Sequence, residues 1–283
     1  MVKPSFDIVS PDYNNDEILN CILLMELSEK LFGYVLCNRE EKLFLALKQY
    51  NLEYYPEKSA SESLKEIISG DELLQHSFKE AVLVYNYPFS DLVPAKYFTP
   101  SASKPMIQLA FGDTFKGLIF SEKIPGLELY NIYRIPSDIH LLAQQKFGGG
   151  KYWHFNTLFV NSTNNASDKN GNTMNLVFYS DKFIVMVKKD QHLQLIQSYP
   201  YQTSEDVAYH LLTICREFEM KQEETFLIIS GLIDEQSALY MELLKYFNEV
   251  HWDSVPDEVN TSQLQHEFPI HYFLPLLKMA LCV

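Results

Sequence analysis

The stretch of sequence that decides the fold runs from Leu19 to Tyr50 and reads LNCILLMELSEKLFGYVLCNREEKLFLALKQY. It contains three apolar segments, which are Leu19–Leu27, Leu31–Cys37 and Leu43–Tyr50, and only short polar turns separate them. Strands that follow one another through such short turns pair antiparallel. The stretch therefore predicts a meander of three antiparallel strands.

The pattern changes after this meander. The segment Ser59–Ser69 (SASESLKEIIS) carries apolar residues at helical spacing, and Ser61 is its candidate N-cap. The next apolar run, Ala81–Tyr85 (AVLVY), is short and lies between polar flanks, which is typical of a central strand. The first part of the chain is thus expected to run strand, strand, strand, helix, strand.

The second half of the chain repeats this order about 150 residues later. Its helix begins at Thr203, which has Asp206 at the capping-box position. The predicted strands are Asn175–Tyr179, Phe183–Val187, Leu193–Tyr199 and Phe226–Ile229. Because a whole order of elements recurs, we expect two related lobes, residues 1–150 and residues 151–283.

Three segments lie outside the repeat. Prolines punctuate Asp91–Tyr133, so loops and short helices are expected there. The polar stretch Asn161–Asn172 (NSTNNASDKNGN) is the strongest candidate for a loop between the lobes. The final stretch, Phe268–Val283, is strongly apolar; we expect a helix docked in the core or between the lobes, with a partner-binding helix as the alternative.

Composition excludes several classes of function. The chain of 283 residues has a formal net charge of −14 and no cluster of Lys and Arg, which argues against binding to nucleic acid. No apolar stretch reaches the roughly 20 residues of a membrane span, and the N-terminus lacks a signal-peptide core. The four cysteines show no CxxC spacing, which is typical of free thiols in a reducing cytosol. We therefore expect a cytoplasmic protein.

The repeated order of strands and helices resembles that of the actin-like ATPase, or ribonuclease-H-like, superfamily. The resemblance implies an α/β fold of two related lobes, with mixed sheets flanked by helices. In active members the turn between the first two strands of each lobe carries acid-x-Gly; the acid organises a metal, and the glycine lets backbone N–H groups approach phosphate. Here the turns read Glu26-Leu27-Ser28-Glu29-Lys30 and Tyr179-Ser180-Asp181-Lys182, and neither contains glycine.

One further element of that superfamily is partly present. In nucleotide-binding members a glycine pair follows the fourth strand of the second lobe, and an adenosine packs against it. This sequence has Ile229-Ser230-Gly231-Leu232 at that place, with one glycine replaced. Ser230, Gly231 and Asp181 are therefore the residues that would bind ATP-Mg in an enzyme, and a strand ending in a plain turn is the other interpretation.

Two local motifs suggest a ligand but have simpler structural explanations. Gly148-Gly149-Gly150 follows a predicted helix over residues 136–147, which is typical of a C-cap and a flexible joint. His266-Glu267-Phe268-Pro269-Ile270-His271 is one residue longer than the zinc-protease HExxH motif, and Pro269 interrupts a helix. We predict no metal site and no catalytic residue.

The double meander, the acidic composition and the apolar ending with Leu281-Cys282 together resemble an uncharacterised bacterial family. The proteins of that family have no known function, and their fold is a duplicated actin-like ATPase fold. The resemblance covers residues 15–283 and implies the fold alone, because no activity is assigned to the family.

The leading hypothesis is a non-catalytic interaction or regulatory protein whose partner is another protein. It rests on the retained repeat together with the missing glycines of the phosphate turns. The alternative is a divergent ATPase or small-molecule kinase that binds ATP-Mg in a cleft between the lobes through Asp181, Ser230 and Gly231. A filament or assembly protein is a third interpretation. No cofactor is expected under the leading hypothesis.

Overall fold

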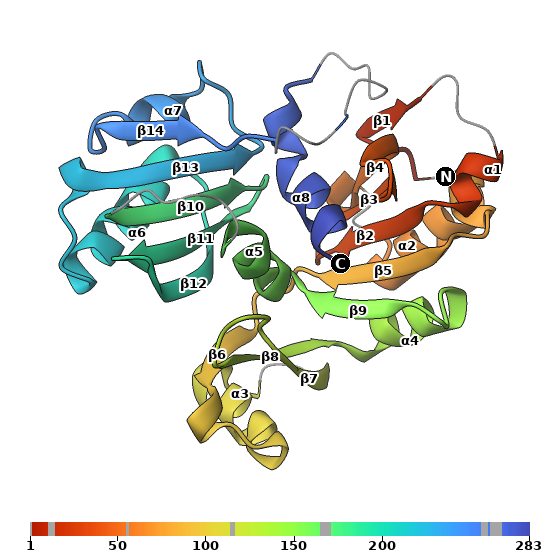
Figure 1. The fold of residues 1–283 in the computed structure, drawn as a ribbon, viewed down its shortest axis with the longest axis horizontal. Helices are drawn as coiled ribbons and strands as arrows, with labels where there is room; N and C mark the ends of the chain where they lie inside the picture. The colour runs from red at the N-terminus through yellow and green to blue at the C-terminus, as the bar shows by residue number, and fades with distance from the viewer. Residues whose placement is uncertain are drawn as a thin grey trace. The chain divides into compact units, whose positions relative to one another are not determined.

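The computed structural model describes residues 2–10, 15–54, 57–113, 117–164, 171–255, 260 and 268–283. Contacts divide the chain into two compact units, both drawn in Figure 1. Unit 1 comprises residues 1–162, 257–267 and 276–283, and unit 2 comprises residues 163–256 and 268–275. The division into lobes 1–150 and 151–283 stays a prediction about the repeat; by contacts, residues 151–162 and the end of the chain belong to unit 1.

Unit 1 is built on a six-stranded mixed sheet. Its strands are β1 (Phe6–Val9), β2 (Ile22–Leu27), β3 (Leu31–Asn38), β4 (Leu43–Asn51), β5 (Glu80–Tyr85) and β9 (Lys151–His154). They lie in the order β1-β4-β3-β2-β5-β9; β2, β3 and β4 form the predicted antiparallel meander, whereas β5 runs parallel to β2 and β9 parallel to β5. All of β2 is buried, which explains its nearly unbroken apolar sequence.

Helices α2 (Ala60–Gly70) and α4 (Ser137–Lys146) pack against the apolar core of this sheet. The shorter helical elements between the strands are α1 (Asn15–Leu19), η1 (Leu52–Tyr54) and η2 (Glu72–Gln75). Helices α2 and α4 contact each other and share one apolar core with the sheet. The cap of α2 is Ser59, which forms a capping box with Glu62. The predicted cap Ser61 is wrong, because the acid must stand three residues after the cap.

The proline-rich region Asp91–Tyr133 contains most of a second, three-stranded antiparallel sheet, which the expectation of loops and short helices misses, whereas short helices do form between its first two strands in sequence. Its strands lie side by side in the order β6 (Ser90–Pro94), β8 (Leu129–Pro136), β7 (Gly117–Lys123). Between β6 and β7 the sequence forms three short helices, η3 (Ala95–Tyr97), η4 (Pro100–Ala102) and α3 (Ser103–Phe111). Pro94 ends β6 and Pro100 begins η4. These two prolines therefore mark the ends of elements, and Pro105 lies in the first turn of α3, where proline is tolerated.

The segment after β9 and the end of the chain are mainly helical. Helix α5 (Phe155–Asn164) follows β9 directly, so the predicted loop Asn161–Asn172 begins as helix, and its residues 165–170 lie outside the described residues. The apolar end of the chain forms η6 (Ile270–Tyr272) and α8 (Leu274–Cys282). Most side chains of α8 are buried, so this segment is the packed helix that its composition predicts and not an exposed tail.

Unit 2 has a five-stranded sheet whose topology matches the larger part of the first. Its strands are β10 (Asn172–Phe178), β11 (Lys182–Lys189), β12 (His192–Pro200), β13 (Thr225–Gly231) and β14 (Glu249–Trp252). The order is β12-β11-β10-β13-β14, with β10 to β12 antiparallel and β10, β13 and β14 parallel. The series β4-β3-β2-β5-β9 has the same order and the same directions, as the repeat in the sequence predicts.

The helices of unit 2 are α6 (Ser204–Glu217) and α7 (Ala238–Leu243), with η5 (Gln222–Glu224) before β13. Thr203 and Asp206 form the predicted capping box at the start of α6. The apolar stripe of α6 packs with β10, β11 and β13 in one core that also contains Leu243 of α7. This core holds β10 and β13 in place, and the predicted ATP-Mg residues Asp181, Ser230 and Gly231 lie at or just after the C-terminal ends of these two strands.

Candidate functional site

The turn between β2 and β3 corresponds to the first phosphate turn of the superfamily. Ser28 lies in this turn, and its Oγ accepts hydrogen bonds from the backbone N–H groups of Lys30 (3.3 Å) and Leu31 (3.0 Å). The Ser28 N–H donates to the carbonyl oxygen of Leu31 at 2.8 Å. The N–H groups that would have to face a phosphate are thus bound by the turn itself, while the exposed carboxylate of Glu29 adds negative charge beside it.

The second turn, between β10 and β11, is closed by its backbone. The N–H of Tyr179 donates to the carbonyl oxygen of Lys182 at 2.9 Å, as in a tight hairpin. Tyr201, which follows β12, forms two hydrogen bonds to this turn. Its hydroxyl donates to the Tyr179 carbonyl (2.7 Å), and its N–H donates to the Asp181 carbonyl (3.2 Å). Burial raises the pKa of Tyr201, and the carboxylate of Asp181 raises it further. Asp181 is only half-buried.

Ser230 and Gly231 end strand β13. The Ser230 hydroxyl is buried and donates to the Leu176 carbonyl oxygen of the neighbouring strand at 3.3 Å. Gly231 has a φ of +85°, and a Cβ at this position would lie 2.2 Å from the carbonyl oxygen of Phe178. Close packing against β10 therefore requires glycine at position 231, whether or not a ligand binds there.

The structure brings the three sequence-predicted residues to one edge of the sheet of unit 2. Strands β10 and β13 are parallel, and Phe178 lies opposite Gly231, so the Asp181 turn and the end of β13 face the same side. A cavity of about 510 Å³ lies beyond this strand end, lined among others by Asp234, Ser237 and Trp252. It is large enough for a small molecule.

Aromatic rings stack along this cavity. The Trp252 ring contacts the rings of Tyr240 (centroids 5.4 Å apart) and His271 (4.1 Å). His271 donates through Nε2 to the carbonyl oxygen of Ile233 at 2.8 Å, and Tyr272 donates to the carboxylate of Asp234. These contacts hold part of the Trp252 ring surface within the protein.

Glu122 of β7 is a partly buried acid that the sequence does not reveal. Its Oε1 accepts the His154 N–H (2.8 Å) and its Oε2 the Tyr133 hydroxyl (3.2 Å), and Thr157 donates from its side chain. Burial raises the pKa of Glu122 to about 7, although these three donors act in the opposite direction. The carboxylate binds at the N-terminus of α5, where negative charge is favourable. Nothing in the sequence SEK distinguishes Glu122 from a solvated acid.

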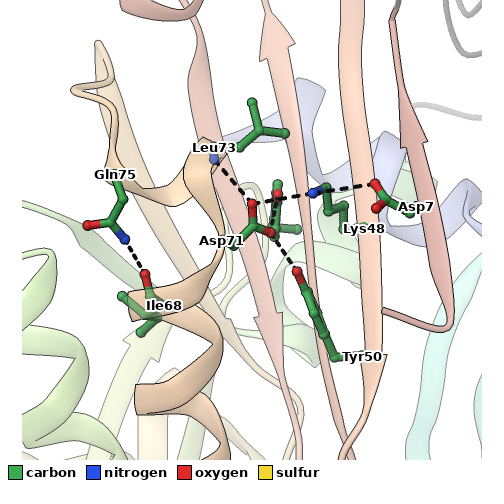
Figure 2. Close-up of polar contacts among 8 residues, drawn as sticks. Asp7, Lys48, Tyr50, Ile68, Asp71, Leu73 and Gln75 are labelled. Atoms are coloured by element: carbon green, nitrogen blue, oxygen red, sulfur yellow. Dashed lines mark hydrogen bonds and ion pairs between the residues drawn. The ribbon is translucent and has the colours of Figure 1, made fainter. Parts of the chain in front are cut away.

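A second buried acid, Asp71, connects α2 to the sheet, as Figure 2 shows. Its Oδ2 accepts the hydroxyls of Tyr34 (2.7 Å) and Tyr50 (2.5 Å), while Oδ1 accepts the Leu73 N–H (3.1 Å) and Lys48 Nζ (3.3 Å). Lys48 also pairs with Asp7 at 3.4 Å. The sequence Ser-Gly-Asp-Glu after a helix suggests only a turn, so sequence reasoning misses this cluster too.

Other functional groups give fewer indications. Within the described residues, no three or more His, Cys, Asp or Glu side chains are arranged to hold a metal ion. His266 and Glu267 of the HExxxH segment lie outside the described residues. All four cysteines are free thiols. None of the described helices is both long enough and apolar enough to cross a membrane.

Comparison with solved structures identifies the fold. A Bacteroides thetaiotaomicron protein of unknown function with an actin-like ATPase fold superposes with a TM-score of 0.75 at 16% identity, covering 85% of this chain and 93% of that one. The PilM-PilN type IV pilus biogenesis complex gives a TM-score of 0.55 at 10% identity, covering 92% and 97%. The fold is therefore the actin-like, ribonuclease-H-like fold with mixed sheets and helices.

Comparison of the sequence gives the family. No curated protein matches the chain. Residues 10–250 match the family described as "Protein of unknown function (DUF3822)". This match spans well over half of the sequence, so the chain belongs to the DUF3822 family of proteins of unknown function.

Proposed function

We propose that this chain is a non-catalytic cytoplasmic protein of the actin-like fold that serves as an interaction or regulatory module for another protein. The observation that carries the proposal is the turn between β2 and β3. Its Lys30 and Leu31 N–H groups donate to the Ser28 hydroxyl, so a phosphate would have to displace that hydroxyl before it could bind.

Two further features support a role without nucleotide. Ser230 uses its hydroxyl inside the sheet, and Gly231 is required by its packing on Phe178. The PilM-PilN complex, which has this fold, is by its name an assembly of two proteins. A frame of this kind can therefore act through surface contacts with a partner rather than through chemistry.

Thermal unfolding with and without ATP-Mg tests the proposal. A ligand at 100 times its Kd stabilises a protein by about 2.7 kcal/mol, so even a weak nucleotide site would raise Tm at millimolar concentration. We expect no change for the wild type. Ser28→Gly, which frees the turn N–H groups, is the matched variant in which weak binding could appear. Stabilisation of the wild type that Asp181→Ala removes would overturn the proposal.

A second candidate, an ATPase or small-molecule kinase, is favoured by one observation. The cavity of about 510 Å³ is lined by Asp234 and Ser237, which follow the Ser230-Gly231 strand end in sequence, whereas Ser230, Gly231 and Asp181 do not line it themselves. Under this alternative Ser230, Gly231 and Asp181 would hold ATP-Mg. Metal-dependent ATP hydrolysis that is lost in Asp181→Ala would establish it, and no turnover in the wild type would exclude it.

A further inference from the structure

A cavity in unit 1 lies away from all of these residues. It has a volume of about 480 Å³ and forms where α2 and α4 end and β5 and β9 begin. These strand starts are at the opposite end of β5 from Tyr85, which pairs with Leu27 beside the Ser28 turn. The apolar part of its lining includes Leu74, Phe78 and Phe147. Its size suits a small organic molecule.

The charged groups of this lining leave an excess of positive charge. Its acid, Glu80, pairs with Lys151 at 2.6 Å, and Lys79 pairs with Glu40 at 2.6 Å. Lys146 also lines the cavity, and no carboxylate among the described residues pairs with it. A positively charged cavity is unusual for a chain whose formal net charge is −14. Its charge therefore favours an anion.

The backbone around the cavity also offers hydrogen-bond donors. At the two helix ends, Gln75 donates to Ile68 O (Figure 2), and the Gly150 N–H donates to Phe147 O at 2.8 Å, so these two carbonyls already have a donor. The N–H groups of Gly148 and Gly149 have no acceptor within the described part of the chain. Two backbone donors and one ammonium group therefore remain for a ligand.

The three glycines differ in what packing demands of them. A Cβ at Gly150 would lie 3.0 Å from the carbonyl oxygen of Ala81, so β5 leaves no room for a side chain there. A Cβ at Gly149 would meet no atom within 4 Å. Packing therefore explains Gly150 and leaves Gly149 unexplained, whereas close approach of a ligand to the backbone would explain it.

We propose that this cavity binds a small molecule with an oxyanion group on a flat apolar body, such as an aromatic carboxylate or phosphate. Lys146 and the N–H groups of Gly148 and Gly149 bind the oxyanion. The apolar body contacts Leu74, Phe78 and Phe147. The flat shape fits because two of these three side chains are aromatic rings.

Two dyes test the proposal. 8-Anilinonaphthalene-1-sulfonate carries an aromatic body and an oxyanion, and N-phenyl-1-naphthylamine is its uncharged counterpart. We expect the sulfonate to bind one site at least tenfold more tightly than the neutral dye, measured by fluorescence titration. Lys146→Glu should weaken sulfonate binding at least tenfold. Lys104→Glu makes the same charge change at an exposed lysine of α3 and should leave it unchanged.

The position of the site is tested by amide chemical shifts of the full chain. The sulfonate should shift the Gly148, Gly149 and Gly150 resonances, and benzoate and phenyl phosphate should each compete with it; the stronger competitor identifies the oxyanion. Equal affinity for both dyes, equal effects of Lys146→Glu and Lys104→Glu, or shifts confined to other residues would each overturn the proposal. Lys146 is exposed, so its substitution leaves folding intact.

Discussion

Replacing Asp71 by asparagine should reduce the free energy of unfolding of unit 1 by about 3 kcal/mol. The side chain of Asp71 is 3% exposed, and its two oxygens accept four hydrogen bonds, from Tyr34, Tyr50, Lys48 and the backbone of Leu73. Asparagine has nearly the same shape but offers one acceptor oxygen. Its NH₂ group would face either the ammonium and N–H donors or the two tyrosine hydroxyls, which would then have to reverse and accept.

The magnitude follows from the bonds that are lost. A hydrogen bond to a charged group contributes roughly 1.5–3 kcal/mol, and at least two of the four lose their charged acceptor or have to reverse in the variant. We take the low end of that range, because asparagine also removes the cost of burying a charged carboxylate. Two bonds at about 1.5 kcal/mol each give a loss of about 3 kcal/mol. Asp7→Asn is the matched control: Asp7 is 50% exposed and pairs only weakly with Lys48, so its loss should cost less than about 0.5 kcal/mol.

Urea unfolding followed by tryptophan fluorescence measures this difference in each unit. The chain has two tryptophans, and Trp153 lies in β9 of unit 1 whereas Trp252 lies in β14 of unit 2. In a Trp252→Phe background, Asp71→Asn should lower the midpoint by about 1 M urea if the slope is about 3 kcal/mol per M. A loss below about 1 kcal/mol, or one equal to that of Asp7→Asn, would refute the reasoning. If Asp71→Asn does not fold, Tyr50→Phe should still cost about 1 kcal/mol.

Three further predictions concern pH and backbone packing. Burial and the Asp71 carboxylate raise the pKa values of Tyr34 and Tyr50 above the ordinary value of 10.0. The two neutral hydroxyls therefore stabilise the folded state fully below pH 10, and this stabilisation is lost as pH rises above 10. Urea midpoints that stay constant above pH 10 would contradict this. The pKa of Glu122 is raised from 4.5 to about 7, so stability should fall between these pH values, by on the order of 3 kcal/mol; Glu122→Gln should flatten that slope, and a slope equal to that of the wild type would exclude this. Gly231→Ala should cost more than about 2 kcal/mol, because φ is +85° and the Cβ would lie 2.2 Å from Phe178 O; a Tm unchanged by this substitution would show that the strands can separate there.

Elements with local signals are predictable from this sequence. The meander of β2, β3 and β4 follows from apolar runs and short turns, and the cap of α6 follows from Thr203 and Asp206. The small sheet β6-β8-β7 is not predictable in this way. Its strands pair across the intervening α3, and the prolines at strand ends resemble loop signals. Long-range pairing leaves little trace in a local pattern.

The buried acids show the same limit at the level of a site. Asp71 and Glu122 are surrounded by polar residues in sequence, so both look like solvated surface acids. Their partners come from distant elements: Tyr34 lies in β3, and His154 lies at the end of β9. Burial of a single acid depends on these long-range contacts, which no spacing within one segment can reveal.

The turn residues give the opposite case, in which a sequence pattern is clear but its physical meaning is not. A β2–β3 turn without glycine could still offer its N–H groups to phosphate, yet the Ser28 hydroxyl accepts two of them. Retention of Gly231 could indicate an adenosine site, yet Phe178 O leaves no room for a Cβ. At both positions the backbone supplies a sufficient reason for the residue that is present. A nucleotide would have to displace the Ser28 hydroxyl from Lys30 and Leu31 before the frame could hold its phosphates, and this is why Ser28→Gly is the substitution most able to expose a nucleotide site.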